Sequence, residues 1–321
     1  MRRWLKEIII ASVLLVGVAV LCFVRWQAWF GMPEEPFWPE EPIEYTFPSS
    51  DSVKAAVGKN ATSTYVVLGD VHNNLKTDDY NAIASRVEHI DAVLQVGDWM
   101  QRGQNYYYQA LLYEWTRSAL YGTPVIVCPG NHEYTKGINK QLSPVWKNAF
   151  PQTDNKPLGV PGASYCIDLP QVRFIVLDTN PMARVMYLTR TLTWIRSLIN
   201  SAGERFIVVL MHHPVFSAAK GRINPIEFSF YHHVLCDADL VLAGHDHSYM
   251  RRAPFVVMNS AGELKPQRTK MKADTAFIEP VYGVLTIQPK SSQPSHPAQL
   301  DLRVYRLDNG VLVDSIYVQH D

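Results

Sequence analysis

The sequence contains little cysteine and no surplus of charge of either sign. Four cysteines in 321 residues, without a Cys-x-x-Cys pair, exclude a disulfide-stapled scaffold and a zinc knuckle. The 30 basic and 30 acidic residues cancel, which argues against a dedicated nucleic-acid-binding protein, because such proteins usually carry a basic surplus. Apolar residues make up 47% of the chain, which is enough to build a core and excludes a wholly disordered protein.

An uncharged apolar run covers residues 8–24, close to the N-terminus. Its length is near the short end of what spans a hydrocarbon core, and tryptophans at 4 and 26 flank it where interfacial residues are expected. A cleaved signal peptide is the alternative interpretation. The run is long for a signal peptide, however, and no small-residue cleavage site follows it. We therefore expect a signal anchor at 8–26 that forms one transmembrane helix.

The flanking charges predict the orientation of this anchor. Arg2, Arg3 and Lys6 precede the run, whereas five glutamates lie between residues 34 and 44. The positive-inside rule then places residues 1–7 in the cytoplasm and the rest of the chain on the non-cytoplasmic side of a membrane, as a single-pass protein. Residues 27–60 are rich in Pro and Glu and are expected to form an extended spacer. Residues 61–321 show no repeat and no internal boundary, so we expect one domain there.

Within this domain, short apolar runs alternate with segments of helical spacing. This alternation is typical of an α/β protein with a parallel or mixed sheet. After Pro254 the apolar runs follow one another with few helices between them, which indicates a second sheet closed by late strands. Helical spacing is seen at 79–90, 106–120 and 188–199, and the apolar runs lie at 65–68, 92–96, 125–128, 174–177, 206–211, 240–243, 256–258, 281–287, 302–307 and 311–318.

Polar residues stand directly after five of these apolar runs. In open α/β sheets the ligand crevice lies at the carboxyl ends of the strands, so five strand ends could deliver their side chains to one place. A lone His or Asp is more often structural than ligating, but here six of the 11 histidines follow strands, each near a carboxylate or an amide. The residues concerned are Asp70 and His72, Asp98, Asn131 and His132, His212 and His213, and His245 and His247.

Carboxylate and imidazole together suit Mn, Fe or Zn better than Ca or Mg. Two metal ions need about seven or eight ligand positions, and the strand-end cluster supplies that number. The sequence therefore predicts a site for two divalent or trivalent metal ions, without choosing among Mn, Fe and Zn.

This ordered set of motifs resembles the calcineurin-like metallophosphoesterase family. The resemblance covers about residues 64–250 and rests on five elements in order, each after a strand-like run. These elements are Gly69-Asp70-Val71-His72, Gly97-Asp98, Gly130-Asn131-His132-Glu133, His212-His213-Pro214 and Gly244-His245-Asp246-His247. The resemblance implies a four-layer α/β/β/α sandwich of two mixed sheets, here preceded by one transmembrane helix.

The resemblance also implies which residues hold the metals. Asp70, His72 and His247 would hold the first metal, and Asp98 would bridge both. Asn131, His212 and His245 would complete the second, with His212 preferred to His213 because the family's ligand usually stands two residues before the proline.

The family's chemistry implies roles for the remaining residues. A hydroxide bridging the two metals would attack phosphorus in line, with Asp98 holding the metals and His132 stabilising phosphoryl oxygens or protonating the leaving group. Arg102 and His213 are expected to contact the substrate. Glu133 is either a support for the local histidines or a partly exposed loop acid.

Departures from the family's subgroups narrow the expected activity. Gln101 stands where protein Ser/Thr phosphatases carry an acid, and Asn73 stands where they carry glycine, so protein phosphatase activity is not expected. We predict a membrane-anchored phosphoesterase acting on a small mono- or diester, with no nucleic-acid partner. Two alternatives stay open: an enzyme acting on lipid or envelope phosphoesters, and a noncatalytic metal-binding scaffold of the same fold.

Overall fold

The computed structural model describes residues 41–48, 50–57, 62–135, 141–150, 156–182, 185–222, 226–268, 272–290 and 297–320, together with Gly17. The chain divides into a unit of residues 1–40 and a compact unit of residues 41–321. The predicted anchor at 8–26 lies outside the described residues, apart from Gly17. Among the residues that are described, no helix has the length and apolar character needed to cross a bilayer.

The first of two mixed sheets has six strands, in the order β13-β12-β11-β1-β2-β3. The three early strands run parallel to one another, and β11 pairs antiparallel with β1 to start a meander that ends with β13. These strands are β1 (Ser63–Leu68), β2 (Ala92–Gln95), β3 (Val125–Val127), β11 (Val281–Gln288), β12 (Ala298–Arg306) and β13 (Leu312–His320).

The second sheet has seven strands, in the order β10-β8-β9-β7-β6-β5-β4. Its centre is parallel, from β5 through β6 and β7 to β9, and its outer strands are antiparallel. These strands are β4 (Tyr165–Asp168), β5 (Val172–Leu177), β6 (Phe206–Met211), β7 (Leu240–Ala243), β8 (Tyr249–Arg252), β9 (Phe255–Val257) and β10 (Thr275–Phe277).

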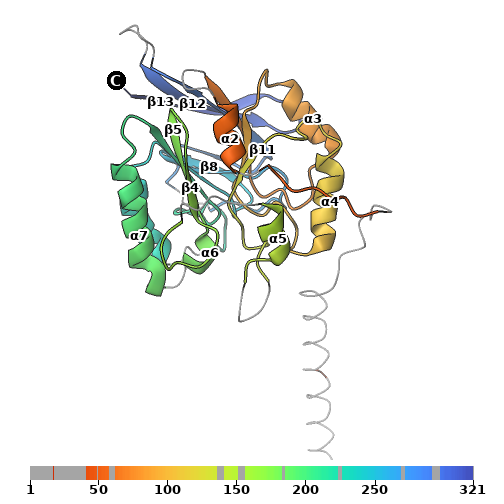
Figure 1. The fold of residues 1–321 in the computed structure, drawn as a ribbon, viewed down its shortest axis with the longest axis horizontal. Coiled ribbons are helices and arrows are strands. Elements are labelled where there is room, and N and C mark those ends of the chain that lie inside the picture. Colours follow the sequence, from red (N-terminus) through yellow and green to blue (C-terminus); the bar gives the residue numbers. More distant parts are fainter. Residues whose placement is uncertain are drawn as a thin grey trace, which may run out of the picture. The chain divides into compact units, whose positions relative to one another are not determined.

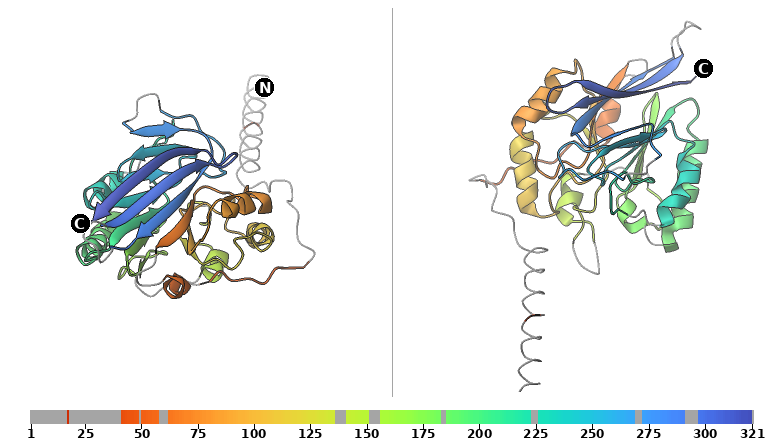
Figure 2. Two further views of the ribbon diagram at one scale, coloured as in Figure 1. Left: turned by 90° about the horizontal axis from the view of Figure 1, so that it is seen from above. Right: turned by 180° about the vertical axis from the view of Figure 1, so that it is seen from behind.

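Three buried clusters arrange these elements in layers. One cluster joins the inner faces of the two sheets, where Tyr65 of β1 meets Phe174 of β5 with ring centroids 5.1 Å apart. A second lies between the first sheet and α3 (Thr77–Ser85), α4 (Asn105–Trp115) and α5 (Pro144–Ala149). A third lies between the second sheet and α7 (Val185–Asn200) and α8 (Ile226–Leu235). Figure 1 shows α3 and α4 on one flank and α7 on the other, and Figure 2 shows the same layers from two further sides. The predicted α/β/β/α order is confirmed.

Each of the ten predicted apolar runs overlaps an observed strand, but β4, β8 and β10 were not predicted. These three strands are short and mix apolar with polar residues, whereas the equally short β3 and β9 are wholly apolar. The helix expected at 79–90 ends at Ser85. The chain must turn there, because Asp91 accepts a hydrogen bond from the Thr64 amide (2.8 Å) and thereby aligns the start of β2 with β1.

The compact unit begins at Glu41, whereas the sequence predicted a spacer as far as residue 60. Within 41–57, α2 (Ser50–Ala56) forms, and Phe47 is only 1% exposed. The ring of Phe47 stacks on Phe150 (4.7 Å) and meets Trp99 and Trp115. Backbone groups of Ile43 and Tyr45 bond to side chains of α4. Because the segment is rich in Pro and Glu, the sequence analysis did not recognise the apolar residues that pack it against the domain.

We predict that Phe47→Ala lowers the free energy of unfolding by about 3 kcal/mol, because it removes a buried aromatic ring and leaves a cavity. Urea unfolding of the full chain would measure the change. Thr46→Ala is the matched control, since Thr46 is exposed and should shift stability by less than about 0.5 kcal/mol. Equal effects of the two substitutions would contradict the placement of this segment in the core.

Candidate metal centre

The polar residues that follow five strands converge where the carboxyl ends of the two sheets meet. Hydrogen bonds across the sheets fix this meeting: the His245 amide donates to Asp70 Oδ1 (2.9 Å), and His212 Nδ1 lies 3.0 Å from the Val96 carbonyl. Within the first sheet, the His72 amide donates to the Asp98 carbonyl (2.9 Å). Strands far apart in the sequence thus present their ends to a shared site.

The backbone at these strand ends is held in a sparsely populated conformation. Six described residues other than glycine have positive φ, and five of them are predicted metal ligands: Asp70 (48°), His72 (52°), Asp98 (52°), His245 (72°) and His247 (52°). Such residues cost of the order of 1 kcal/mol or more each and cluster at functional sites. The sixth is Asn73 (62°), which shows why asparagine can stand where related motifs carry glycine.

Two glycines allow the strand ends to approach closely. A Cβ added to Gly130 would lie 2.1 Å from Asp98 Oδ1, and one added to Gly97, whose φ is +92°, would lie 2.5 Å from His212 Nδ1. Any side chain at these positions would displace a predicted ligand.

The first group of potential ligands comprises Asp70, His72, Asp98 and His247. Their ligand atoms lie within 4.8 Å of one another, and all four residues are buried. The Nε2 atoms of His72 and His247 are 3.2 Å apart, and His72 Nε2 is 3.6 Å from Asp98 Oδ2. The Nδ1 of His247 faces the Glu263 carbonyl (2.6 Å), which can only accept, so Nδ1 carries the proton and Nε2 keeps a lone pair toward the site.

The second group is centred on His212. Its Nε2 lies 3.2 Å from Asp98 Oδ2, 3.1 Å from Asn131 Oδ1 and 3.2 Å from His245 Nδ1. Since the Nδ1 of His212 faces the Val96 carbonyl, the neutral imidazole would point its lone pair at oxygen and nitrogen acceptors. Asp98 therefore lies between the two groups. His212, His213 and His245 also form a set of potential ligands within 4.8 Å, so the geometry alone does not separate His212 from His213.

The chemistry of these donors fits cations in both positions. Asp70 Oδ2 is buried and has no hydrogen-bond partner among the described residues. Burial raises the pKa of Asp70 to about 8 and lowers the pKa of His72 to about 3, which favours a neutral imidazole. Burial opposes charge on His212 as well, but Asp98 and Asp70 outweigh it and raise its pKa to about 9. Two buried carboxylates thus draw in positive charge, which metal ions would supply.

His132 stands at the open side of the site. Its amide donates to Asp98 Oδ1 (2.8 Å), its Nδ1 faces the Gln101 carbonyl (2.6 Å), and its Nε2 is 4.0 Å from Asp98 Oδ2. The side chain is 31% exposed, so Nε2 can meet a substrate above the metal positions.

Glu133 is neither an exposed loop acid nor a partner of histidines. It is 1% exposed, and its carboxylate accepts the amides of Asp98 (2.9 Å), Gly130 (2.7 Å) and Met100 (3.0 Å). Burial, together with the charge of Asp98, raises its pKa to about 7. Glu133 therefore binds the backbone that positions Asp98 and Asn131.

A sixth strand end, which the sequence analysis did not single out, also contributes. After β5, Thr179 Oγ1 lies 2.7 Å from His213 Nδ1 and orients that ring. Asn180 Nδ2 donates to the Gly130 carbonyl, and buried Asp178 accepts from Tyr134 Oη (2.5 Å). The sequence did contain a pattern that could have identified this strand end. Asp178, Thr179 and Asn180 follow an apolar run directly, as polar residues do at the other strand ends.

Arg102 is not brought into contact with the two groups of ligands. It is half-buried and lies close to Tyr107. Among the described residues, no hydrogen bond or ion pair joins its side chain to the predicted ligands. Its role in substrate binding stays a prediction.

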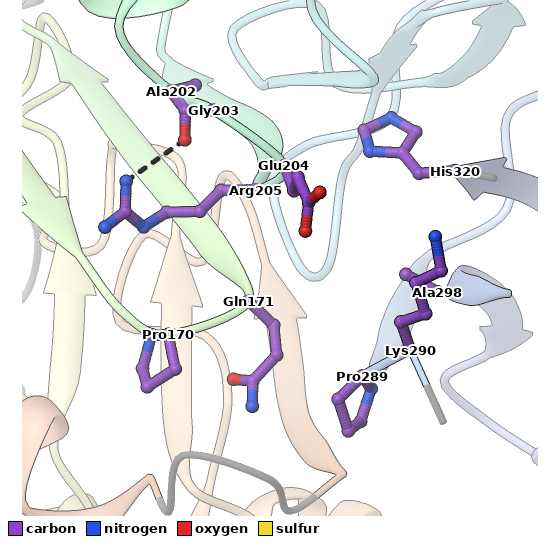
Figure 3. Close-up of a pocket in the computed structure, with 10 residues that line it drawn as sticks. All are labelled: Pro170, Gln171, Ala202, Gly203, Glu204, Arg205, Pro289, Lys290, Ala298 and His320. Atoms are coloured by element: carbon purple, nitrogen blue, oxygen red, sulfur yellow. Dashed lines mark hydrogen bonds between the residues drawn. The ribbon is translucent and has the colours of Figure 1, made fainter. Parts of the chain in front are cut away.

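A pocket of about 430 Å³ lies at the other end of the sheets, before the starts of β5 and β6 (Figure 3). Its arginine, Arg205, donates to the carbonyls of Ala202 and Leu169, and His320 bonds to Asp239. No group of potential metal ligands among the described residues lies there. We therefore place the chemistry at the metal centre.

Comparisons with known proteins agree with this site. A family model described as calcineurin-like phosphoesterase matches residues 63–249. The glycerophosphodiester phosphodiesterase GpdQ of Enterobacter lignolyticus (strain SCF1) is 26% identical over 171 residues, which cover 50% of this chain and 57% of that protein.

Two solved structures are similar in fold. The purple acid phosphatase PPD1 from yellow lupin (Lupinus luteus) seeds has a TM-score of 0.59 at 17% identity, over 82% of this chain and 54% of that one. GAP50 of Plasmodium, described as the anchor in the inner membrane complex, has a TM-score of 0.52 at 13% identity, over 82% and 90%. The chain therefore spans little more than half the length of GpdQ and of the lupin phosphatase.

We predict that Glu133→Gln lowers the free energy of unfolding by about 2 kcal/mol, because one amide oxygen cannot accept all three buried N–H groups. It should also weaken metal binding by about 10- to 100-fold, as loss of a group supporting the ligands does. Urea unfolding and metal titration would measure the two effects. Exposed Glu88→Gln is the control, and unchanged metal affinity in Glu133→Gln would contradict the assigned role.

Proposed function

The chain belongs to the calcineurin-like phosphoesterase family, and on that premise we propose that it is a metal-dependent hydrolase of small phosphate mono- or diesters. One observation carries the proposal: the buried Asp98 carboxylate lies between two groups of potential ligands, 3.6 Å from His72 Nε2 and 3.2 Å from His212 Nε2. This arrangement suits a pair of metal ions that share one carboxylate.

We assign Asp70, His72 and His247 to the first metal, Asn131, His212 and His245 to the second, and Asp98 to both. When bound, the metals would supply Lewis acidity toward phosphoryl oxygens and would activate a water molecule. Asp70 and Asp98 are the only carboxylates in this set, and Asn131 is neutral, so two divalent cations would leave the site positively charged and attractive to a phosphate anion.

The chain's own groups complete the chemistry. The carbonyl of Gln101 holds the His132 ring at Nδ1, and the partly exposed ring keeps Nε2 4.0 Å from the Asp98 carboxylate. From there Nε2 can donate a proton to the leaving oxygen or a hydrogen bond to a phosphoryl oxygen. Thr179 orients His213 beside His245, where it can contact the same phosphoryl group. The His213 and His245 rings lie close together, which supports a site where both can contact one phosphate group.

GpdQ is named for hydrolysis of a glycerophosphodiester, and the lupin protein is named as a phosphatase. A noncatalytic scaffold usually lacks one or more ligands, whereas here all seven assigned positions are present. We therefore favour an enzyme over a scaffold.

We further propose that residues 8–26 anchor the protein in a membrane, with the phosphoesterase domain on the non-cytoplasmic side. The support is the uncharged apolar run and the basic residues that precede it. An anchor of this kind also fits an enzyme that acts on lipid or envelope phosphoesters.

Metal-dependent turnover is the first expected result. The metal-free full chain should be inactive toward p-nitrophenyl phosphate and bis-p-nitrophenyl phosphate, and Mn, Zn or Fe should restore activity. Asp98→Asn should lower bound metal and activity together, while His132→Ala should lower kcat by about 10²- to 10⁴-fold with metal retained. Asp78→Asn and His89→Ala are matched controls away from the site. Bound metal with no turnover toward any phosphoester would favour the scaffold.

The anchor predicts that the full chain sediments with membranes and resists extraction by high salt or carbonate, because burial of about 17 apolar residues is not reversed by screening charge. Protease added to sealed cells or spheroplasts should digest the domain but leave a cytoplasmic control protein intact. Replacing Leu14 and Leu15 by Arg should release the protein, and a chain that is already soluble without these changes would contradict the anchor.

A further inference from the structure

Two loops form one wall of the metal centre and carry a concentration of positive charge. The loop after β6 and the loop after β9 lie side by side, because the Lys220 amide donates to the Pro266 carbonyl (2.7 Å) and the Arg268 amide donates to the Ala218 carbonyl (2.9 Å). We refer to these two loops as the cationic wall. Its described basic side chains are Lys220, Arg222, Lys265, Arg268 and Lys272.

Two of these basic residues are bonded to the backbone of predicted ligands, Arg222 through its guanidinium group and Lys265 through its amide. Arg222 Nη2 donates to the His245 carbonyl (3.1 Å), and the Lys265 amide donates to the His247 carbonyl (3.3 Å). Arg222 therefore borders the second group of ligands, and Lys265 borders the first. They are also neighbours of each other: the pKa of Lys265 is lowered by burial and, next, by the charge of Arg222.

Neither cation forms an ion pair within the described part of the chain: both side chains are half-buried, and no carboxylate there lies within 4.0 Å of either. Asp70, Glu263 and Asp246 act on the charge of Lys265 from a greater distance, and Asp246 interacts in the same way with Arg222. The nearby acids are otherwise placed: buried Asp246 accepts the amides of Ala218 and Ala219, and Glu263 is exposed. Two half-buried cations without a direct ion pair, beside a site proposed to bind an anion, are therefore available to an anionic ligand.

We propose that Arg222 and Lys265 bind a second anionic group of the substrate, so that the preferred phosphoester carries a further phosphate or carboxylate. This inference rests on the proposed function and narrows its substrate class. The metal centre would take the phosphoryl group to be hydrolysed, and the cationic wall would take the second anion. A guanidinium offers five N–H donors, and the described contact to His245 uses one, so Arg222 retains donors for an anion.

The test compares two ligands that cannot be hydrolysed, methylphosphonate with one anionic group and methylenediphosphonate with two. Isothermal titration of the metal-loaded full chain gives the ratio of their dissociation constants. Arg222→Gln and Lys265→Gln should each lower the preference for methylenediphosphonate by about tenfold, since each removes a charged hydrogen bond. Lys290→Gln is the matched control, an exposed lysine at the distant pocket (Figure 3), and should keep the wild-type ratio.

Taking a ratio separates anion binding from a merely structural role of Arg222. If Arg222 only holds the His245 backbone, its loss weakens both ligands equally and the ratio stays at the wild-type value. Metal content measured after each titration excludes removal of metal by the diphosphonate. An unchanged ratio in both variants, with metal retained and with binding to phosphoinositide vesicles also unchanged, would overturn the proposal.

A second arm asks where the additional anion resides. Binding to phosphatidylcholine vesicles with and without a phosphatidylinositol monophosphate is measured for the same variants. A loss confined to the vesicles assigns the second anion to a lipid headgroup, and a loss confined to methylenediphosphonate assigns it to a soluble substrate. Turnover of p-nitrophenyl phosphate by the wild-type chain is read separately, so that failure of the phosphoesterase function is distinguished from failure of the cationic wall.

Discussion

The burial of two carboxylates at one point is the constraint on which the rest of this structure depends. Asp70 is 0% exposed and Asp98 is 1% exposed, and they belong to the same group of ligands. Taking an ion out of water costs several kcal/mol unless opposite charge compensates it. The surrounding histidines and the amides that donate to Asp70 and Asp98 compensate part of this negative charge. The expected metal ions would compensate the rest.

The fold meets the requirement by bringing two sheets together at their carboxyl ends. Neither sheet holds the whole set, because Asp70, Asp98 and Asn131 follow strands of one sheet, while His212 and His245 follow strands of the other. The apolar interface between the sheets therefore sets the distances within the site. It also supports the positive φ angles of five ligands, since isolated loops would relax from such conformations.

Charge in this protein is organised locally. The chain as a whole is neutral, yet the buried acids Asp70, Asp98 and Glu133 lie at the metal centre, and the basic residues Arg222 and Lys265 lie beside it. Glu133 is a further example of a locally placed charge. Its buried carboxylate accepts three backbone amides of the loops that carry Asp98 and Asn131. Groups that touch no substrate thus determine how precisely the reacting groups are held.

The sequence by itself determined the fold class, ten of the thirteen described strands and the cluster at the strand ends, because apolar runs and the polar residues that follow them are local patterns. Tertiary structure alone decided what depends on contacts between distant segments. Phe47 belongs to the core only because Trp115 of α4 and Phe150, which follows α5, present aromatic rings to it, and Glu133 is buried where its carboxylate accepts the Asp98 amide. Thr179 and the cationic wall reach the site for the same reason, since the loops that carry them meet the ligands only once the two sheets have packed.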